Sequence, residues 1–103
     1  MTEQVIQKSI IKYLKTKAYV VKIISASKSG IPDLLVLYRG MLIAVEIKTP
    51  DKRNNVSDLQ KYNLDEITRH GGHAYVACSL NEVKEIISQV DKQLKGAKAS
   101  FNC

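Results

Sequence analysis

Residues 30–48, GIPDLLVLYRGMLIAVEIK, decide the fold of this chain. Two apolar runs of this length between turn signals predict two strands, and Arg39-Gly40 between them predicts a tight hairpin with a two-residue loop. In that register Tyr38 pairs with Met41, and Asp33 lies directly opposite Glu46. Directly opposed side chains point to the same face of a sheet, with Cβ atoms roughly 5 Å apart. The hairpin therefore predicts two carboxylates side by side at its open end.

Two opposed carboxylates repel each other and destabilise a sheet, so something must offset the repulsion. A divalent cation is the obvious candidate, because Asp33 and Glu46 are hard oxygen ligands suited to Mg²⁺ or Mn²⁺. The backbone carbonyl of Ile47 lies between the two acidic groups and can supply another oxygen. Lys48 is two residues beyond Glu46 and shares its face. These residue types predict metal-assisted phosphodiester hydrolysis, in which Lys48 holds the attacking water or stabilises developing negative charge.

Capping signals and apolar periodicity place the other elements around this hairpin. Thr2 to about Lys17 and the segments that follow Ser57 and Ser79 are expected to be helices, and β-branched or apolar runs predict strands at residues 18–24 and 73–78. The predicted order is α-β-β-β-α-β-α. Helices on both faces of the hairpin would give an α/β sandwich with a mixed four-stranded sheet. We expect one domain over residues 1–95 and a basic, frayed tail over residues 96–103.

Several further residues are candidates for the site or its surroundings. Glu3 reaches the acids if the first helix begins beside the hairpin end. Otherwise it only interacts favourably with the helix dipole as a carboxylate in the first turn. Gln60 completes a capping box with Ser57, yet its helix follows the site loop, so it can also face the site. Basic residues in the loops and at this helix start are candidates for DNA contact, with solvated loops as the equal alternative: Lys28, Lys52, Arg53 and Lys61.

The bulk properties favour a small basic protein with a polyanionic partner. The chain has 103 residues and a net charge of +6, and nucleic acid is the usual partner of such a domain. No apolar stretch approaches the ~18 residues that span a membrane, and the start lacks the pattern of a signal peptide. We therefore expect a cytoplasmic protein. Its small size suggests a phage or mobile-element protein that acts in the host cell.

The motif Gly30-Ile31-Pro32-Asp33 followed by Glu46-Ile47-Lys48 resembles the PD-(D/E)xK nuclease motif. More narrowly, the chain resembles the VRR-NUC branch in minimal, stand-alone form, with Glu3 on the first helix and Gln60 at a helix start. The resemblance covers residue 2 to about residue 94. It implies a restriction-endonuclease-like fold, with Asp33, Glu46, Lys48 and Gln60 as catalytic residues and Asp33, Glu46, Ile47 and Glu3 as metal ligands.

Minimal proteins of this branch are similar to Holliday-junction resolvases, which act as homodimers on branched DNA. The resemblance therefore implies a Mg²⁺- or Mn²⁺-dependent, structure-specific DNA endonuclease. Two alternatives stay open at this stage. One is a non-catalytic DNA-binding or accessory protein on the same fold, and the other is a nuclease that cuts flaps, single strands or RNA. The Asp…Glu-x-Lys triplet can also arise as an accidental surface cluster.

Overall fold

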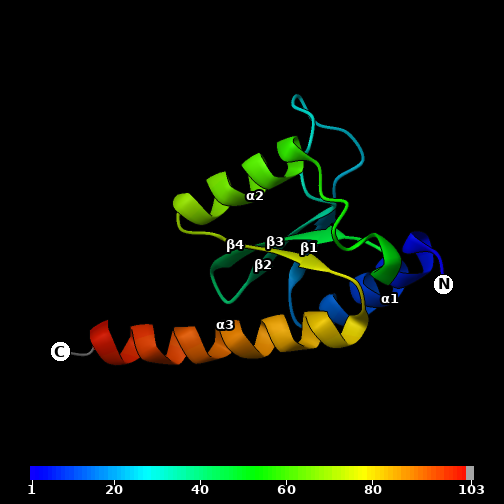
Figure 1. The fold of residues 1–103 in the computed structure, drawn as a ribbon. Helices are drawn as coiled ribbons and strands as arrows, with labels where there is room; N and C mark the ends of the chain where they lie inside the picture. Colours follow the sequence, from blue (N-terminus) through cyan, green and yellow to red (C-terminus); the bar gives the residue numbers. More distant parts are fainter. Residues whose placement is uncertain (102–103) are drawn as a thin grey trace.

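The computed structural model describes the backbone of residues 1–101 and the side chains of residues 1–95. Its elements follow the predicted order, with one added turn of 3-10 helix, η1 (Figure 1). They are α1 (Glu3–Leu14), β1 (Tyr19–Lys22), β2 (Leu34–Tyr38), β3 (Met41–Ile47), η1 (Pro50–Lys52), α2 (Asp58–Arg69), β4 (His73–Ala77) and α3 (Leu80–Phe101). Each of the three α-helices begins at its predicted capping signal, Thr2, Ser57 or Ser79.

The predicted hairpin and its register are confirmed. Tyr38 pairs with Met41, and the antiparallel ladder continues to the pair of Leu34 and Val45. The turn residues Arg39 and Gly40 have φ angles of 51° and 82°, so both adopt the left-handed conformation of a type I′ turn. This turn matches the right-handed twist of the two strands, which explains why a two-residue loop is sufficient.

The sheet has four strands in the order β1-β2-β3-β4, and its mixed character is confirmed. β1 and β3 run antiparallel to β2, whereas β4 runs parallel to β3. A parallel neighbour needs a crossover connection, and α2 provides it. β3 is therefore a central strand, and its carboxyl end, with Glu46 and Ile47, lies between β2 and β4.

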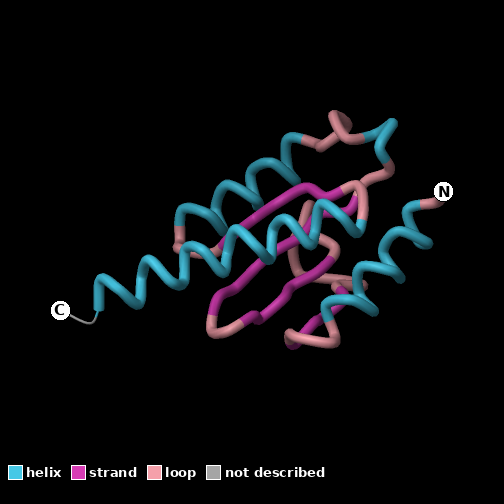
Figure 2. Tube along the Cα trace, turned by 90° about the horizontal axis from the view of Figure 1, so that it is seen from below, coloured by secondary structure: helices cyan, strands magenta, loops and turns pink. Residues whose placement is uncertain are grey.

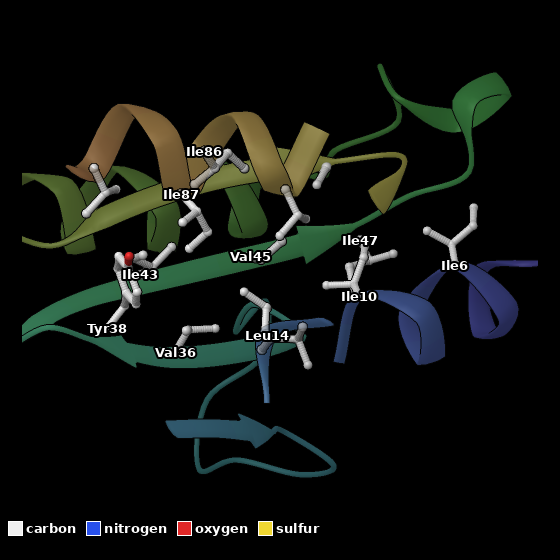
Figure 3. Close-up of a cluster of buried hydrophobic side chains, with 14 residues drawn as sticks. Ile6, Ile10, Leu14, Val36, Tyr38, Ile43, Val45, Ile47, Ile86 and Ile87 are labelled. Carbon is white, nitrogen blue, oxygen red and sulfur yellow. The ribbon is translucent and has the colours of Figure 1, made fainter. Parts of the chain in front are cut away.

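The hydrophobic core lies between one face of the sheet and the helices α1 and α3 (Figures 1 and 2). Alternate residues of β2 and β3 point into it, as the period of two requires. Figure 3 shows these side chains packed against those of the two helices. The core includes Ile6, Ile10 and Leu14 from α1, Val36, Ile43, Val45 and Ile47 from the hairpin, and Val83, Ile86, Ile87 and Val90 from α3.

The opposite face of the sheet is only partly covered. α2 packs on this face against β4, at one edge of the sheet. Tyr19 on β1, Leu37 on β2 and Leu42 on β3 remain exposed there. The predicted helical cover on both faces of the hairpin is therefore incomplete, because α2 follows the β4 edge and leaves the outer strands open.

The carboxyl-terminal helix α3 continues as far as Phe101. The fraying predicted for residues 96–103 stays a prediction, and residues 102–103 lie outside the described residues. Cys78 is a buried free thiol. Among the helices of the described chain, none has the length and hydropathy needed to cross a membrane.

Gly30 joins the loop before β2 to the first turn of α2. Its φ angle is +78°, a left-handed conformation that favours glycine, and a Cβ atom there would lie 2.9 Å from backbone and side-chain atoms of Leu59. The adjacent Ser29 carbonyl accepts a hydrogen bond from the Asn63 side chain at 3.1 Å. The loop and α2 can approach this closely because residue 30 is a glycine and has no side chain.

Gly30→Ala is expected to lower the free energy of unfolding by about 1–3 kcal/mol more than Gly40→Ala does, because it adds steric overlap to backbone strain. Gly40 is the matched control, since it also has a positive φ angle but nothing lies within 4 Å of its added Cβ. Urea denaturation followed by circular dichroism measures both variants. Equal losses would show that the contact with Leu59 relaxes without strain.

Candidate active site

Asp33 and Glu46 face each other at the open end of the hairpin. The ladder pairs Leu34 with Val45, so its next position sets Asp33 opposite Glu46, as predicted. Glu46 is buried, with a relative exposure of 4%. Burial, and then the charge of Asp33, raise the pKa of Glu46 to about 8, while Lys48 acts in the opposite direction. Around neutral pH the pair therefore retains a proton unless a positive charge replaces it.

Lys48 lies beside the same carboxylate. Its Nζ atom is 3.8 Å from Oε2 of Glu46, and the two side chains are 16% and 5% exposed. The predicted placement of Lys48 on the face of Glu46 is thus observed. The largely buried Lys48 ammonium thus places one positive charge and a hydrogen-bond donor at the edge of the acid pair.

Gln60 both completes the capping box and faces the site, the two roles that its position in the sequence allowed. Its Oε1 accepts a hydrogen bond from the Ser57 N–H at 3.0 Å, and its own N–H donates to Ser57 Oγ at 3.1 Å, which completes the capping box of α2. Its Nε2 donates to Oε2 of Glu46 at 3.2 Å. The helix cap therefore orients the side-chain amide toward the site and fixes one oxygen of Glu46.

The backbone of Ile47 is available to the site because of Pro32. In the continued register Pro32 lies opposite Ile47, in a position where two residues ordinarily exchange N–H···O bonds. Proline has no N–H to donate, so the Ile47 carbonyl lacks that ladder partner. The Ile47 N–H instead donates to Oδ2 of Asp33 at 2.7 Å. The N–H thus fixes Asp33, and the carbonyl on the same side of the strand is left for another ligand.

Glu3 is less closely associated with the acid pair than Lys48 and Gln60 are. It lies at the start of α1 and contributes the smallest of the named repulsions that raise the pKa of Glu46. Among the described residues, no group of three or more histidine, cysteine, aspartate or glutamate side chains could hold a metal ion. The structure thus brings together two acids and leaves Glu3 outside their group, so its role as a ligand stays a prediction.

The basic residues predicted to contact DNA differ in their surroundings. Arg53 forms a salt bridge with Glu82 at the start of α3, which fastens the loop after η1 to that helix. Glu82 also accepts a hydrogen bond from the Cys78 N–H at 2.8 Å. Lys28 lies at the rim of the groove beside α2, while Lys52 and Lys61 are exposed. Sequence reasoning missed the salt bridge, because the two partners are 29 positions apart.

The donor set at this site suits a hard divalent cation. Two opposed carboxylates and a carbonyl without its ladder partner supply oxygen ligands, which Mg²⁺ and Mn²⁺ prefer. A cation between the carboxylates would relieve the repulsion that raises the pKa of Glu46. Lys48 and Gln60 approach the same carboxylate from outside. The arrangement can hold a cation, orient a water molecule and stabilise negative charge on a bound phosphate.

Comparisons with known proteins agree with this geometry. The sequence-family model described as the VRR-NUC domain matches residues 1–81. A solved structure described as a VRR-NUC domain is 28% identical, with a TM-score of 0.68, and the match covers 84% of this chain and 94% of that one. A second, described as a VRR-NUC domain protein, has the same fold at 21% identity and a TM-score of 0.67, covering 86% and 87%. No curated protein matches the chain.

The raised pKa of Glu46 predicts a pH-dependent stability in the absence of divalent cations. A carboxyl group whose pKa rises from 4.5 to about 8 on folding stabilises the fold fully below pH 4.5, and this stability is lost as the pH rises through 8. In EDTA, the free energy of unfolding should fall by about 1–3 kcal/mol more between pH 5 and pH 8.5 in the wild type than in Glu46→Gln.

Urea denaturation at the two pH values measures this difference. Glu66→Gln is the control, because Arg69 holds the pKa of Glu66 below its ordinary value and that residue contributes no such loss. If Glu46→Gln retains the full wild-type dependence on pH, the buried acid pair does not titrate as described.

Proposed function

The chain belongs to the VRR-NUC domain family of nucleases, and on that premise we propose that it is a Mg²⁺- or Mn²⁺-dependent endonuclease that hydrolyses branched DNA such as Holliday junctions. One observation carries the proposal. Asp33 and Glu46 are opposed at the end of a hairpin with Lys48 beside them. A structural role alone gives no reason to bury Glu46 against a second acid, whereas cation binding does.

The residues of the chain have distinct parts in this reaction. Asp33, Glu46 and the Ile47 carbonyl would hold the cation, which when bound polarises a phosphate oxygen and acidifies a water molecule. Lys48 holds the attacking water at its Nζ atom or donates a hydrogen bond to the phosphate oxygen that gains charge. Gln60 orients Glu46 through its Nε2 atom. Attack of the water oxygen forms a new bond to phosphorus and breaks the bond between phosphorus and the leaving oxygen. The water gives up one proton to the solvent, and the leaving oxygen takes up one proton.

The proposed substrate and assembly follow from charge and symmetry. A net charge of +6 on 103 residues favours a polyanion, and DNA is the substrate that we propose. Exposed Lys52 and Lys61 and the rim residue Lys28 are the proposed phosphate contacts. Cleavage of a branched junction at two symmetric positions requires two symmetric sites, which a homodimer provides.

Cleavage of labelled four-way junctions and linear duplexes, with and without Mg²⁺, tests the proposal. Wild type should cut the junction only with the cation, while Glu46→Gln should lose at least about 10²-fold in rate because it removes a cation ligand and a charge. Asp65→Asn on the exposed part of α2 is the matched control and should cut normally. A wild type that binds junctions equally well without Mg²⁺ and cuts none of them would instead support a non-catalytic DNA-binding protein.

Pro32→Ala tests the part assigned to the Ile47 carbonyl. The substitution restores an N–H opposite this carbonyl, so the affinity for Mn²⁺ should fall about tenfold, a typical effect for a group that prepares a metal ligand. Calorimetric titration with Mn²⁺ measures the affinity, and circular dichroism verifies folding. Pro50→Ala, in the exposed turn η1, is the control. Unchanged affinity in folded Pro32→Ala would remove the Ile47 carbonyl from the proposed ligands.

A further inference from the structure

The face of the sheet that carries Asp33 and Glu46 continues as rows of apolar side chains. Residues two apart on a strand share a face, so the pairing register defines these rows. The row next to the acids consists of Val21, Leu35 and Ala44, and the row after it consists of Tyr19, Leu37 and Leu42. The acid pair is thus one end of a surface that extends across β1, β2 and β3.

Most of this surface is open to solvent. Tyr19 is 70% exposed, Leu37 50%, Leu42 41% and Val21 37%. In the row next to the acids, Leu35 is half-buried and Ala44 is buried. We call Tyr19, Val21, Leu37 and Leu42 the open face. A contiguous exposed apolar surface on one side of a small protein is a mark of a binding site.

A groove borders the open face on the side of α2. It has a volume of about 610 Å³, and its lining includes Leu35 and Leu42 from the sheet, Ile67 from α2, and the polar residues Lys28, Asn63 and Glu66. Apolar walls with a few polar groups are typical of sites that receive a flat organic group. The groove and the open face share Leu42, so they form one continuous surface.

The position of this surface favours the substrate as its occupant. Rows two residues apart are separated by roughly 7 Å along the strands, so Val21 lies within about 7 Å of the acid row and Tyr19, Leu37 and Leu42 within roughly 13 Å of it. A second protein molecule that covered this face as far as the first row would obstruct access to Asp33 and Glu46. A nucleic acid strand whose phosphate reaches the acids extends over the adjacent row in any case, because its next nucleotides lie only a few ångströms away.

The chemistry of the surface selects among nucleic acids. None of the four side chains of the open face carries a charge, so these side chains offer little to a duplex, which presents its phosphates outward. Unpaired bases present apolar π-faces that pack on aromatic and aliphatic side chains. We propose that the open face binds unpaired bases next to the cleaved phosphate, so that the substrate class is nucleic acid with unpaired nucleotides at the cleavage position. This inference rests on the proposed function and makes its substrate more specific.

Binding measured without cleavage provides the first test. Fluorescence anisotropy in EDTA compares a labelled single strand of fifteen thymidines with a duplex of equal length. The double variant Tyr19→Ser/Leu37→Ser should bind the single strand about tenfold more weakly, with duplex affinity within twofold of wild type. Val5→Ser is the matched control, because Val5 is also half exposed but lies on α1, across the sheet. Circular dichroism verifies that each variant folds.

Three outcomes would overturn the inference. Equal affinities of wild type and double variant for the single strand would show that the open face does not contact bases. Equal losses on single strand and duplex would show that the contacts do not distinguish unpaired bases. A wild-type dimer that the double variant splits into monomers, measured by light scattering, would assign the open face to a second copy of the chain.

Cleavage assays separate this inference from the proposed function. The double variant should show a KM raised about tenfold on a junction with unpaired bases, with kcat retained, since the acids are untouched. If wild type and the double variant cut that junction equally well, the inference fails and the proposed function stands. If wild type cuts nothing while the double variant still loses single-strand affinity, the proposed function fails and the open face remains a binding surface.

Discussion

The opposition of two like charges across a hairpin is the constraint on which the rest of this structure depends. It follows from a turn of two residues, because Arg39 and Gly40 set a register that brings Asp33 opposite Glu46. A shift of one residue would move every side chain of β3 to the other face and would place Glu46 among the residues of the core. The same register that buries Ile43, Val45 and Ile47 therefore also assembles the acids.

The surrounding elements each compensate for one consequence of this opposition. The Ile47 N–H stabilises Asp33, Lys48 offsets the charge of Glu46, and Gln60 holds one Glu46 oxygen. Pro32 leaves the Ile47 carbonyl without a ladder donor because it has no N–H, while the Ile47 N–H donates to Asp33 Oδ2. The close contact of Gly30 with Leu59 then keeps α2, and with it Gln60, against the end of the hairpin.

Much of the fold and the centre of the candidate site could be predicted from the sequence because they depend on local patterns. The hairpin register follows from a turn and two apolar runs, and the capping signals mark the helix starts. The open face was not predicted, since an apolar strand such as β3 shows that both faces favour burial but not which element covers them. The salt bridge between Arg53 and Glu82 was not predicted either, because it joins residues whose proximity only the tertiary fold creates.

The side chain of Gln60 makes two hydrogen bonds, one to the helix cap and one to Glu46, and together they restrict which residues can occupy position 60. A capping box accepts glutamate as readily as glutamine at its third helical residue, because either side chain can accept from the backbone N–H of the cap. Here the second side-chain atom of residue 60 must donate to Glu46, which a carboxylate cannot do. Glutamate would preserve the helix start and place a third carboxyl group beside the acid pair. Glutamine and glutamate are thus interchangeable in the capping box but not in the site.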